Sequence, residues 1–366
     1  MVKILYNGLG LSSTPSGVQY YTEYLIAEAF RHTDDKAYVL LTQNYGKSRV
    51  PEYPHSTFQI NGRFHRIVFE HFCLPGIYKR NRFDILHCPA YILPWNFRGR
   101  SVVTVHDIIA LDYPELCKTS NSLYFSLSLA RSIQRADRII SVSEHVKNDI
   151  VRKLGIIPDK IAVTRLGVSP LFRPVSDSVI LRSVRNKYRL PEHYLLFVGN
   201  IEPKKNLVRL IRAYNVVRRR SYPNLKLVLA GQLGWKYKAV TKVVSQWRLE
   251  EKVLFLGYVP LADLPSLYTM ANLFVFPSLY EGFGLPPLEA MACGVPVVTS
   301  TAGALPETTA GYAIYADPFS ESDLADKIEQ GLSIDHRRTE QGMQYAQRQT
   351  WQKTWTETLA VYQSLL

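Results

Sequence analysis

The chain has 366 residues, of which 46% are hydrophobic and 20% charged. This composition excludes a disordered chain, and the length favours two domains over one. The formal net charge of +13 is spread over both halves and suits an anionic partner, such as a nucleotide diphosphate, an acidic membrane surface or nucleic acid. A solvated basic surface without a partner is the alternative interpretation.

The start of the chain does not resemble a targeting segment. The first apolar run, residues 1–7, ends at Gly8 and is shorter than the core of a signal peptide. No apolar run approaches the roughly 18–20 residues that a membrane-spanning helix needs. The four cysteines (Cys73, Cys88, Cys117 and Cys293) form no CxxC pair, so we expect a cytoplasmic location.

Short β-branched strands alternate with helices through the first half, which predicts a parallel sheet with crossover helices. Helix 123–135 has Leu123, Leu127 and Ala130 at the spacing of a buried stripe, so we expect these residues to face the core. We predict strands at 3–7, 37–42, 85–88, 102–106, 138–142 and 161–164, and the other helices at 18–30 and 144–153.

The pattern stops after Leu166, where residues 167–174 contain one glycine and two prolines. A second alternating series then predicts strands at 194–198, 226–230, 253–255, 273–276 and 295–299, with a helix at 207–219. The expected fold is therefore α/β, with two doubly wound, Rossmann-like domains that face each other across a cleft. Its expected parts are a first domain at 1–170, a linker at 171–192, a second domain at 193–345 and a C-terminal helix at 346–366.

Ligands of open α/β sheets bind at the carboxyl ends of the strands, which directs attention to the loops there. The segment 281–298 (EGFGLPPLEAMACGVPVV) follows the predicted strand 273–276. Gly282 and Gly284 let the backbone approach a ligand, and Pro286 and Pro287 suit the first turn of a helix whose free N–H groups favour a diphosphate. Glu281 on the loop and Glu289 in the first helical turn can both reach hydroxyl groups of one ligand. For Glu289, a favourable interaction with the helix dipole alone is the alternative.

Three further loops carry candidate residues. Lys204 and Lys205 lie between a strand and a helix, where they can neutralise a departing diphosphate. His106 and Asp107 end the predicted strand 102–106, although a single histidine is more often structural. The loop after the first strand runs to Gln19, which with Ser16 matches a capping box; a simple turn is the alternative. Its glycine spacing is not G-x-G-x-x-G, so the sequence does not support nicotinamide binding.

The Glu-x7-Glu frame of segment 281–298 resembles retaining glycosyltransferases of family 4, which have the GT-B fold. The resemblance covers nearly the whole chain, and within the family the chain is most similar to bacterial mannosyltransferases of O-antigen and surface polysaccharide synthesis. It includes the segments 102–107 (VVTVHD), 198–207 (VGNIEPKKNL), 229–231 (LAG), 234–235 (GW) and 259–277.

The resemblance implies a hexosyltransferase that takes mannose from GDP-mannose and transfers it to a glycan or polyprenyl-linked acceptor. A UDP-sugar donor of glucose or N-acetylglucosamine is the alternative. The donor is expected on the second domain and the acceptor on the first, onto which the C-terminal helix crosses back. A lipid-linked acceptor would bring the protein into peripheral contact with the inner face of the plasma membrane.

The resemblance also implies roles for individual residues. Glu281 would contact the donor sugar, Glu289 the ribose diol and Lys205 the diphosphate, while His106 would hold the sugar near its reacting carbon. Lys204 stands where the family often has arginine, and Asn200 where some members have a further one. The implied catalytic residues are His106, Glu281 and Lys205, and the implied donor-binding residues are Gly17, Asn200, Lys204, Lys205, Val259, Glu281, Phe283, Gly284, Leu285 and Glu289.

Enzymes of the other common glycosyltransferase fold bind a metal through an Asp-x-Asp motif, which this sequence lacks. We therefore expect no metal and no other cofactor, with lysines supplying the positive charge. A non-catalytic nucleotide-sugar-binding scaffold on the same fold is the alternative from another class. Nucleic-acid binding rests on net charge alone, without a recognised module, so we expect no nucleic-acid partner. A glycan phosphorylase is an alternative among enzymes, although the chain is short for one.

Overall fold

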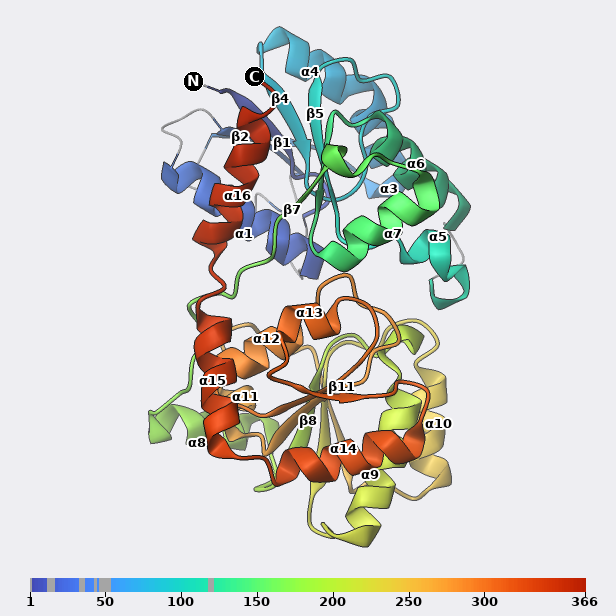
Figure 1. The fold of residues 1–366 in the computed structure, drawn as a ribbon, viewed down its shortest axis with the longest axis vertical. Coiled ribbons are helices and arrows are strands. Elements are labelled where there is room, and N and C mark those ends of the chain that lie inside the picture. The colour runs from blue at the N-terminus through green and yellow to red at the C-terminus, as the bar shows by residue number, and fades with distance from the viewer. Residues whose placement is uncertain (1, 12–16, 33–36, 43–44, 46–53, 118–121) are drawn as a thin grey trace. The chain divides into compact units, whose positions relative to one another are not determined.

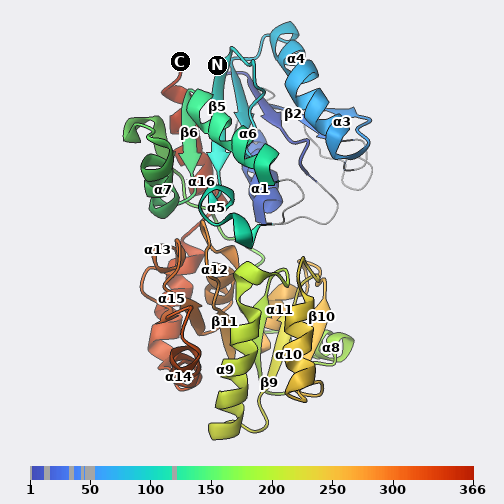
Figure 2. The same cartoon turned by 90° about the vertical axis from the view of Figure 1, so that its right-hand side faces the viewer.

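The computed structural model describes residues 2–11, 17–32, 37–42, 45, 54–117 and 122–366. The chain divides into a first unit, Met1–Gly167 with Trp351–Leu366, and a second unit, Val168–Thr350. Each unit has a parallel sheet of its own with helices packed around it (Figure 1 and Figure 2). The predicted α/β fold of two Rossmann-like domains is therefore confirmed.

The first sheet has the strand order β3-β2-β1-β4-β5-β6-β7. All residues of its central strands β1 and β4 are buried, as expected for a parallel sheet with both faces covered. The strands are β1 (Ile4–Asn7), β2 (Ala37–Thr42), β3 (His55–Phe58), β4 (Ile85–Cys88), β5 (Arg100–Val105), β6 (Arg138–Ser141) and β7 (Ile161–Val163).

Helices connect these strands, and one of them contains a π-helical turn. The α-helices are α1 (Gly17–His32), α3 (Gly62–Val68), α4 (Leu74–Arg80), α5 (Ile109–Asp112), α6 (Ser122–Arg135), α7 (Glu144–Leu154) and α16 (Trp351–Gln363), and the π-turn η1 (Phe69–Cys73) joins α3 to α4. Helix α16 packs against α1, and its Trp351 ring stacks on Tyr24 with 4.9 Å between ring centres. Trp351, Trp355 and Tyr362 are buried, whereas Leu359 is half-buried.

The second sheet has the strand order β10-β9-β8-β11-β12-β13. Its strands are β8 (Tyr194–Val198), β9 (Lys226–Ala230), β10 (Val253–Gly257), β11 (Leu273–Phe276), β12 (Val297–Ser300) and β13 (Ile314–Ala316). Its helices are α8 (Ser178–Tyr188), α9 (Leu207–Arg220), α10 (Lys238–Gln246), α11 (Leu264–Met270), α12 (Leu285–Ala292), α13 (Leu305–Thr309), α14 (Glu321–Leu332) and α15 (His336–Gln347), with a 3₁₀ turn η5 (Pro203–Lys205). The predicted strands agree with the observed ones to within two residues at each end; β3 and β13 were not predicted.

One of the residues expected on the buried face of α6 was predicted wrongly. Leu127 is 63% exposed, and the core is instead contacted by Leu129 and Ile133. Two serines share the buried face: Ser132 Oγ donates to the Ser128 carbonyl and accepts from the Leu93 N–H at 2.9 Å, whereas Ser128 Oγ has no hydrogen-bond partner among the described residues. Ala130 is half-buried, and the side chain of Leu123 lies outside the part that the structure describes, so the prediction is wrong for Leu127.

The segment 171–192, interpreted from its prolines as a linker, contains helix α8 and belongs to the second unit. Asp177 caps this helix, accepting from the backbone N–H of Val179 at 2.8 Å, and α8 packs against α11. No helix in the described part of the chain is long and apolar enough to cross a membrane.

Candidate active site

The loops that follow the neighbouring strands β8 and β11 bring Lys205 and Glu281 together. Lys205 Nζ lies 2.5 Å from Glu281 Oε1 and 4.7 Å from the centre of the Phe276 ring. The two loops are also joined through the backbone, since the Leu279 N–H donates to the Lys204 carbonyl at 2.8 Å. Residues 76 positions apart in sequence thus form one polar centre at the carboxyl edge of the second sheet.

This centre is an ion pair in a mostly buried setting, because Lys205 is only 9% exposed. Burial lowers the pKa of Lys205, although Glu281 opposes this change. Burial acts to raise the pKa of Glu281, but Lys205, Lys204 and hydrogen bonds outweigh it and hold that pKa below its ordinary value. Lys204 adds a second positive charge next to the pair, with its Nζ 4.0 Å from Glu202 Oε1.

The backbone around the pair is tightly constrained. A methyl group at Gly303, where φ is +61°, would overlap the backbone of Glu281, and the Ala304 N–H donates to the Glu281 carbonyl at 2.8 Å. Asn206 has a φ of +60°, and its side-chain amide donates to the carbonyls of Pro277 and Pro318 at 3.1 and 2.7 Å. These contacts fix both loops before any ligand binds.

Helix α12 follows Glu281 and begins at Leu285, after Gly284 with a φ of +106°. A Cβ at Gly284 would lie 2.7 Å from Leu305 Cδ2, so glycine is required there for both conformation and space. The Phe283 carbonyl accepts from Thr308 Oγ1 at 2.6 Å. No side chain caps the start of α12 among the described residues; Pro286 and Pro287 have no backbone N–H, so in this first turn the N–H of Leu285 is the group that can face an anion.

Glu289 is the fifth residue of α12, so its placement in the first helical turn was wrong. The dipole effect fades within one turn, which weakens the interpretation that the dipole alone explains this glutamate. Tyr268 Oη donates to Glu289 Oε2 at 3.2 Å. Burial raises the pKa of Glu289 to about 7, although the bond from Tyr268 opposes this shift.

The remaining candidates of the second unit, Asn200 and Val259, follow strands at the same sheet edge. Asn200 is exposed in the turn after β8, and Val259 is buried in the segment after β10. The turns after β8 and β9 approach closely, because a methyl group at Gly231 would overlap the Gly199 carbonyl.

In the first unit, His106 follows β5 and is buried against two aromatic rings, Tyr21 at 4.7 Å and Tyr91 at 5.4 Å between ring centres. Its Nε2 lies 2.8 Å from the Pro89 carbonyl, which can only accept, so Nε2 carries the hydrogen. Burial lowers the pKa of His106 to about 4. The imidazole is therefore neutral at pH 7, with Nδ1 as an acceptor. Asp107 Oδ1 accepts from the Ile109 N–H at 3.4 Å.

Gly17 is the exposed first residue of α1, and a Cβ there would meet nothing within 4 Å. Ser16 lies outside the described residues, so the predicted capping box is not described. Gln19 donates from its side chain to the Gly10 carbonyl at 2.7 Å.

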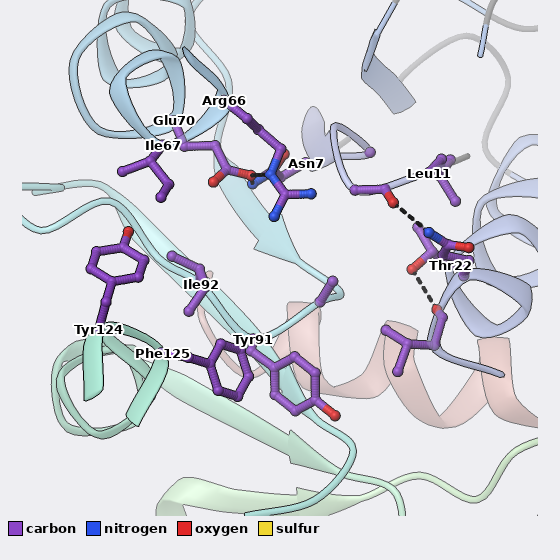
Figure 3. A pocket seen from close by; sticks show the side chains of 15 residues that line it. Asn7, Leu11, Thr22, Arg66, Ile67, Glu70, Tyr91, Ile92, Tyr124 and Phe125 are labelled. Carbon is purple, nitrogen blue, oxygen red and sulfur yellow. Dashed lines mark hydrogen bonds and ion pairs between the residues drawn. The ribbon is translucent and has the colours of Figure 1, made fainter. Parts of the chain in front are cut away.

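The sequence analysis missed a pocket in the first unit, which Figure 3 shows. Its polar residues include Asn7, Arg66 and Glu70, brought together from β1, α3 and the π-turn. An arginine and a glutamate four positions apart are common on exposed helices, so spacing gave no signal. In the part of the chain that the structure describes, no three His, Cys, Asp or Glu side chains form a group that could hold a metal ion.

Comparison with known families places two matches along the chain. The family described as Glycosyltransferase Family 4 matches residues 15–170, and the one described as Glycosyl transferases group 1 matches residues 183–349.

Comparison with individual proteins finds similar relatives in Escherichia coli. The chain is 36% identical over 285 residues to the O-antigen chain mannosyltransferase B, with 77% of this chain and 74% of that protein aligned. It is 30% identical over 249 residues to the serotype-specific mannosyltransferase WbdA, covering 67% of this chain but only 30% of that longer protein. Among solved structures, Anabaena Alr3699/HepE in complex with UDP and glucose matches all of both chains with a TM-score of 0.78 at 21% identity, which shows a shared fold.

Proposed function

Because the chain belongs to the GT-B glycosyltransferases of family 4, we propose that it transfers mannose from GDP-mannose to a glycan or lipid-linked acceptor in surface polysaccharide synthesis. The mannosyltransferase relatives support the sugar and the pathway. A UDP-sugar donor is the second candidate, favoured by the UDP and glucose of the Anabaena structure.

The observation that carries the proposal is the Lys205–Glu281 pair beside the uncapped start of α12. Breaking the bond between the sugar and the diphosphate concentrates negative charge on the leaving group. In our proposal Lys205, Lys204 and the Leu285 N–H at the start of α12 stabilise that charge, so that no metal ion is needed. The Glu281 carboxylate holds Lys205 in place and accepts hydrogen bonds from the sugar hydroxyls.

Two further residues position the donor in this proposal. Glu289 binds the ribose diol as a carboxylate. His106 accepts a hydrogen bond from a sugar hydroxyl through Nδ1, because its Nε2–H is used by Pro89. Asn200, Val259, Phe283, Leu285 and the glycines Gly17 and Gly284 complete the proposed donor contacts through their backbones and apolar surface.

We propose transfer with retention by attack on the face from which the diphosphate leaves. The acceptor oxygen forms a bond to the anomeric carbon as the bond from that carbon to the diphosphate oxygen breaks. The acceptor proton passes to the leaving phosphate. This route needs no protein nucleophile.

The experiment is a thermal-shift panel with GDP-mannose, UDP-glucose, UDP-N-acetylglucosamine, an ADP-sugar and a dTDP-sugar, each measured once with EDTA and once with Mg²⁺. A ligand that binds only the folded state raises the melting temperature. We expect GDP-mannose to give the largest shift. When an extract that contains the acceptor is added to GDP-mannose and the protein, we expect GDP to be released. Binding without turnover would support the scaffold alternative, and a shift that requires a divalent ion would contradict the metal-independent mechanism.

We also propose contact with an anionic membrane through the outer face of α3, η1 and α4. Phe64 and Phe72 are 79% and 76% exposed on this helical run, and Val68 between them is also exposed. Lys79 and Arg80 are exposed at its C-terminal end, which suits acidic lipid headgroups. Cosedimentation should occur with phosphatidylglycerol vesicles and fall in the double variant Phe64→Ser, Phe72→Ser. Equal sedimentation of both proteins would contradict this surface.

A further inference from the structure

The first unit contains a pocket of about 230 Å³ at the carboxyl ends of β1 and β4. Pockets for drug-sized ligands are usually larger, roughly 300–1,000 Å³, so this one suits a single small ring. As Figure 3 shows, Arg66 and Glu70 enter it from one helical run, and Tyr91 and Phe125 lie along another side. The pocket therefore combines a charged end with aromatic surface.

The charged end is incompletely satisfied. Glu70 is only 6% exposed. Among the described residues, its carboxylate accepts one direct hydrogen bond, from the Asn7 side-chain amide at 3.3 Å. Arg66 Nε is 3.9 Å from Glu70 Oε1, too far for a hydrogen bond, and this buried nitrogen has no hydrogen-bond partner in the structure as described. In a purely structural ion pair we expect the two charged groups to lie within hydrogen-bond distance of each other. In a binding site their unused hydrogen-bonding capacity is available to a ligand.

The local backbone also indicates a binding site. Glu70 lies in the π-turn η1, where the Leu74 N–H donates to the Phe69 carbonyl five residues earlier. Such turns are rare and occur frequently at functional sites. Here the turn buries the consecutive residues Glu70 and His71.

The contacts of His71 decide whether the Tyr124 hydroxyl can donate a hydrogen bond in the pocket. Its Nδ1 accepts from the Trp95 N–H at 3.2 Å, so in the neutral ring Nε2 carries the hydrogen and donates to Tyr124 Oη at 3.0 Å. Burial lowers the pKa of His71, which favours this neutral form. The Tyr124 hydroxyl, which lines the pocket, then keeps its own hydrogen for a ligand.

We propose that this pocket binds one hexopyranose ring of the acceptor. Sugar hydroxyls donate to the Glu70 carboxylate and accept from Arg66, Asn7 and Tyr124, while an apolar face of the ring contacts Tyr91 and Phe125. A neutral polyhydroxyl ligand fits better than phosphate, because the buried Glu70 carboxylate repels an anion. Naming the ring as part of the acceptor rests on the proposed function.

The test is saturation-transfer NMR on the full chain with three probes, the methyl α-glycosides of mannose, glucose and galactose. At least one should bind, and Glu70→Gln should weaken that binding about 10- to 100-fold, the effect of losing a hydrogen bond to a charged group. Glu115→Gln, which changes an exposed carboxylate of the same unit, is the matched control and should bind like the native chain. Circular dichroism checks that each variant folds.

Other results would overturn the inference. These are the absence of binding by all three glycosides, unchanged binding in Glu70→Gln, and loss of binding in Glu281→Gln instead, which would place the sugar on the second unit. Inorganic phosphate is a further probe. If the native chain broadens its NMR signal and Glu70→Gln does not, the pocket is an anion site, and this result also contradicts the inference. The nucleotide-sugar thermal shift, measured on the same proteins, separates this failure from failure of the proposed donor site.

Discussion

Lys205 Nζ and Glu281 Oε1 lie 2.5 Å apart, although the two residues belong to loops after different strands of the second sheet. Both side chains are nearly buried, so each charge depends on the other for compensation. Removing one partner of a buried pair leaves the other uncompensated, whereas replacing both can be nearly neutral for folding. A comparison of single and double variants therefore distinguishes the contribution of the pair to stability from its contribution to catalysis.

Glu281→Gln should destabilise the protein by about 3–5 kcal/mol and lower turnover about 10²- to 10³-fold. In the double variant Lys205→Met, Glu281→Gln, stability should recover in part while turnover stays low. Urea unfolding and GDP release measure the two effects. Asp326→Asn, which breaks the exposed pair with Arg220, is the control and should leave stability and turnover close to those of the native chain. Recovery of turnover in the double variant would contradict a direct role of Lys205.

Donor affinity should depend on pH through Glu289, whose pKa burial raises to about 7. The carboxylate accepts two hydroxyl hydrogens, but its protonated form loses part of that capacity. The dissociation constant of the donor nucleotide should therefore rise as pH falls from 8 to 6, by up to about tenfold per pH unit below the pKa. Calorimetric titration at pH 8, 7 and 6 tests this, and Glu289→Gln should bind more weakly with a flat profile. A flat profile in the native chain would exclude Glu289 from nucleotide binding.

The polar centre of the second unit could be predicted because its geometry follows from topology. Lys205 and Glu281 each come shortly after a buried strand, and parallel neighbours such as β8 and β11 end at the same sheet edge. Their pairing distance and burial could not be predicted, because these depend on the close approach of Gly303 to the Glu281 backbone.

Other features left no readable pattern. The π-turn that buries Glu70 depends on one extra residue in a helical run, which hydrophobic spacing does not show. β3, with the sequence HSTF, has too few apolar residues for a strand signal, and β13 has only three residues. On α6, Ser128 and Ser132 are buried while Leu127 is exposed, which hydrophobic spacing does not show.

Acid should destabilise the first unit through His87. This residue is fully buried between Tyr362 Oη, 2.5 Å from Nδ1, and Thr104 Oγ1, 2.8 Å from Nε2. Burial, helped by His106, lowers the pKa of His87 to about 3, and burial lowers that of His106 to about 4. The unfolded histidines titrate near pH 6.5, so below that pH the unfolded chain binds protons that the folded unit excludes.

The free energy of unfolding should therefore fall by about 1.4 kcal/mol per pH unit for each histidine between about pH 6 and pH 4. Hydrogen exchange of the backbone amides of β4 and β5, corrected for the intrinsic exchange rates, measures this free energy for the first unit. His87→Gln should lower the slope by about 1.4 kcal/mol per pH unit, while His193→Gln, at an exposed position of the second unit, should leave it unchanged. An unaltered slope in His87→Gln would show that this histidine is already protonated in the folded unit.

Two glycines of the second unit separate backbone strain from crowding at the active site. Gly303 and Gly311 have φ values of +61° and +83°, so alanine costs roughly 1–2 kcal/mol at either position. At Gly311 a methyl group meets nothing within 4 Å, whereas at Gly303 it would overlap the backbone of Glu281. Gly311→Ala should therefore show only the strain and retain turnover. Gly303→Ala should lose more stability and also turnover, because Glu281 must shift away from Lys205. Equal melting temperatures and equal rates for the two variants would mean that the position of Glu281 does not limit the reaction.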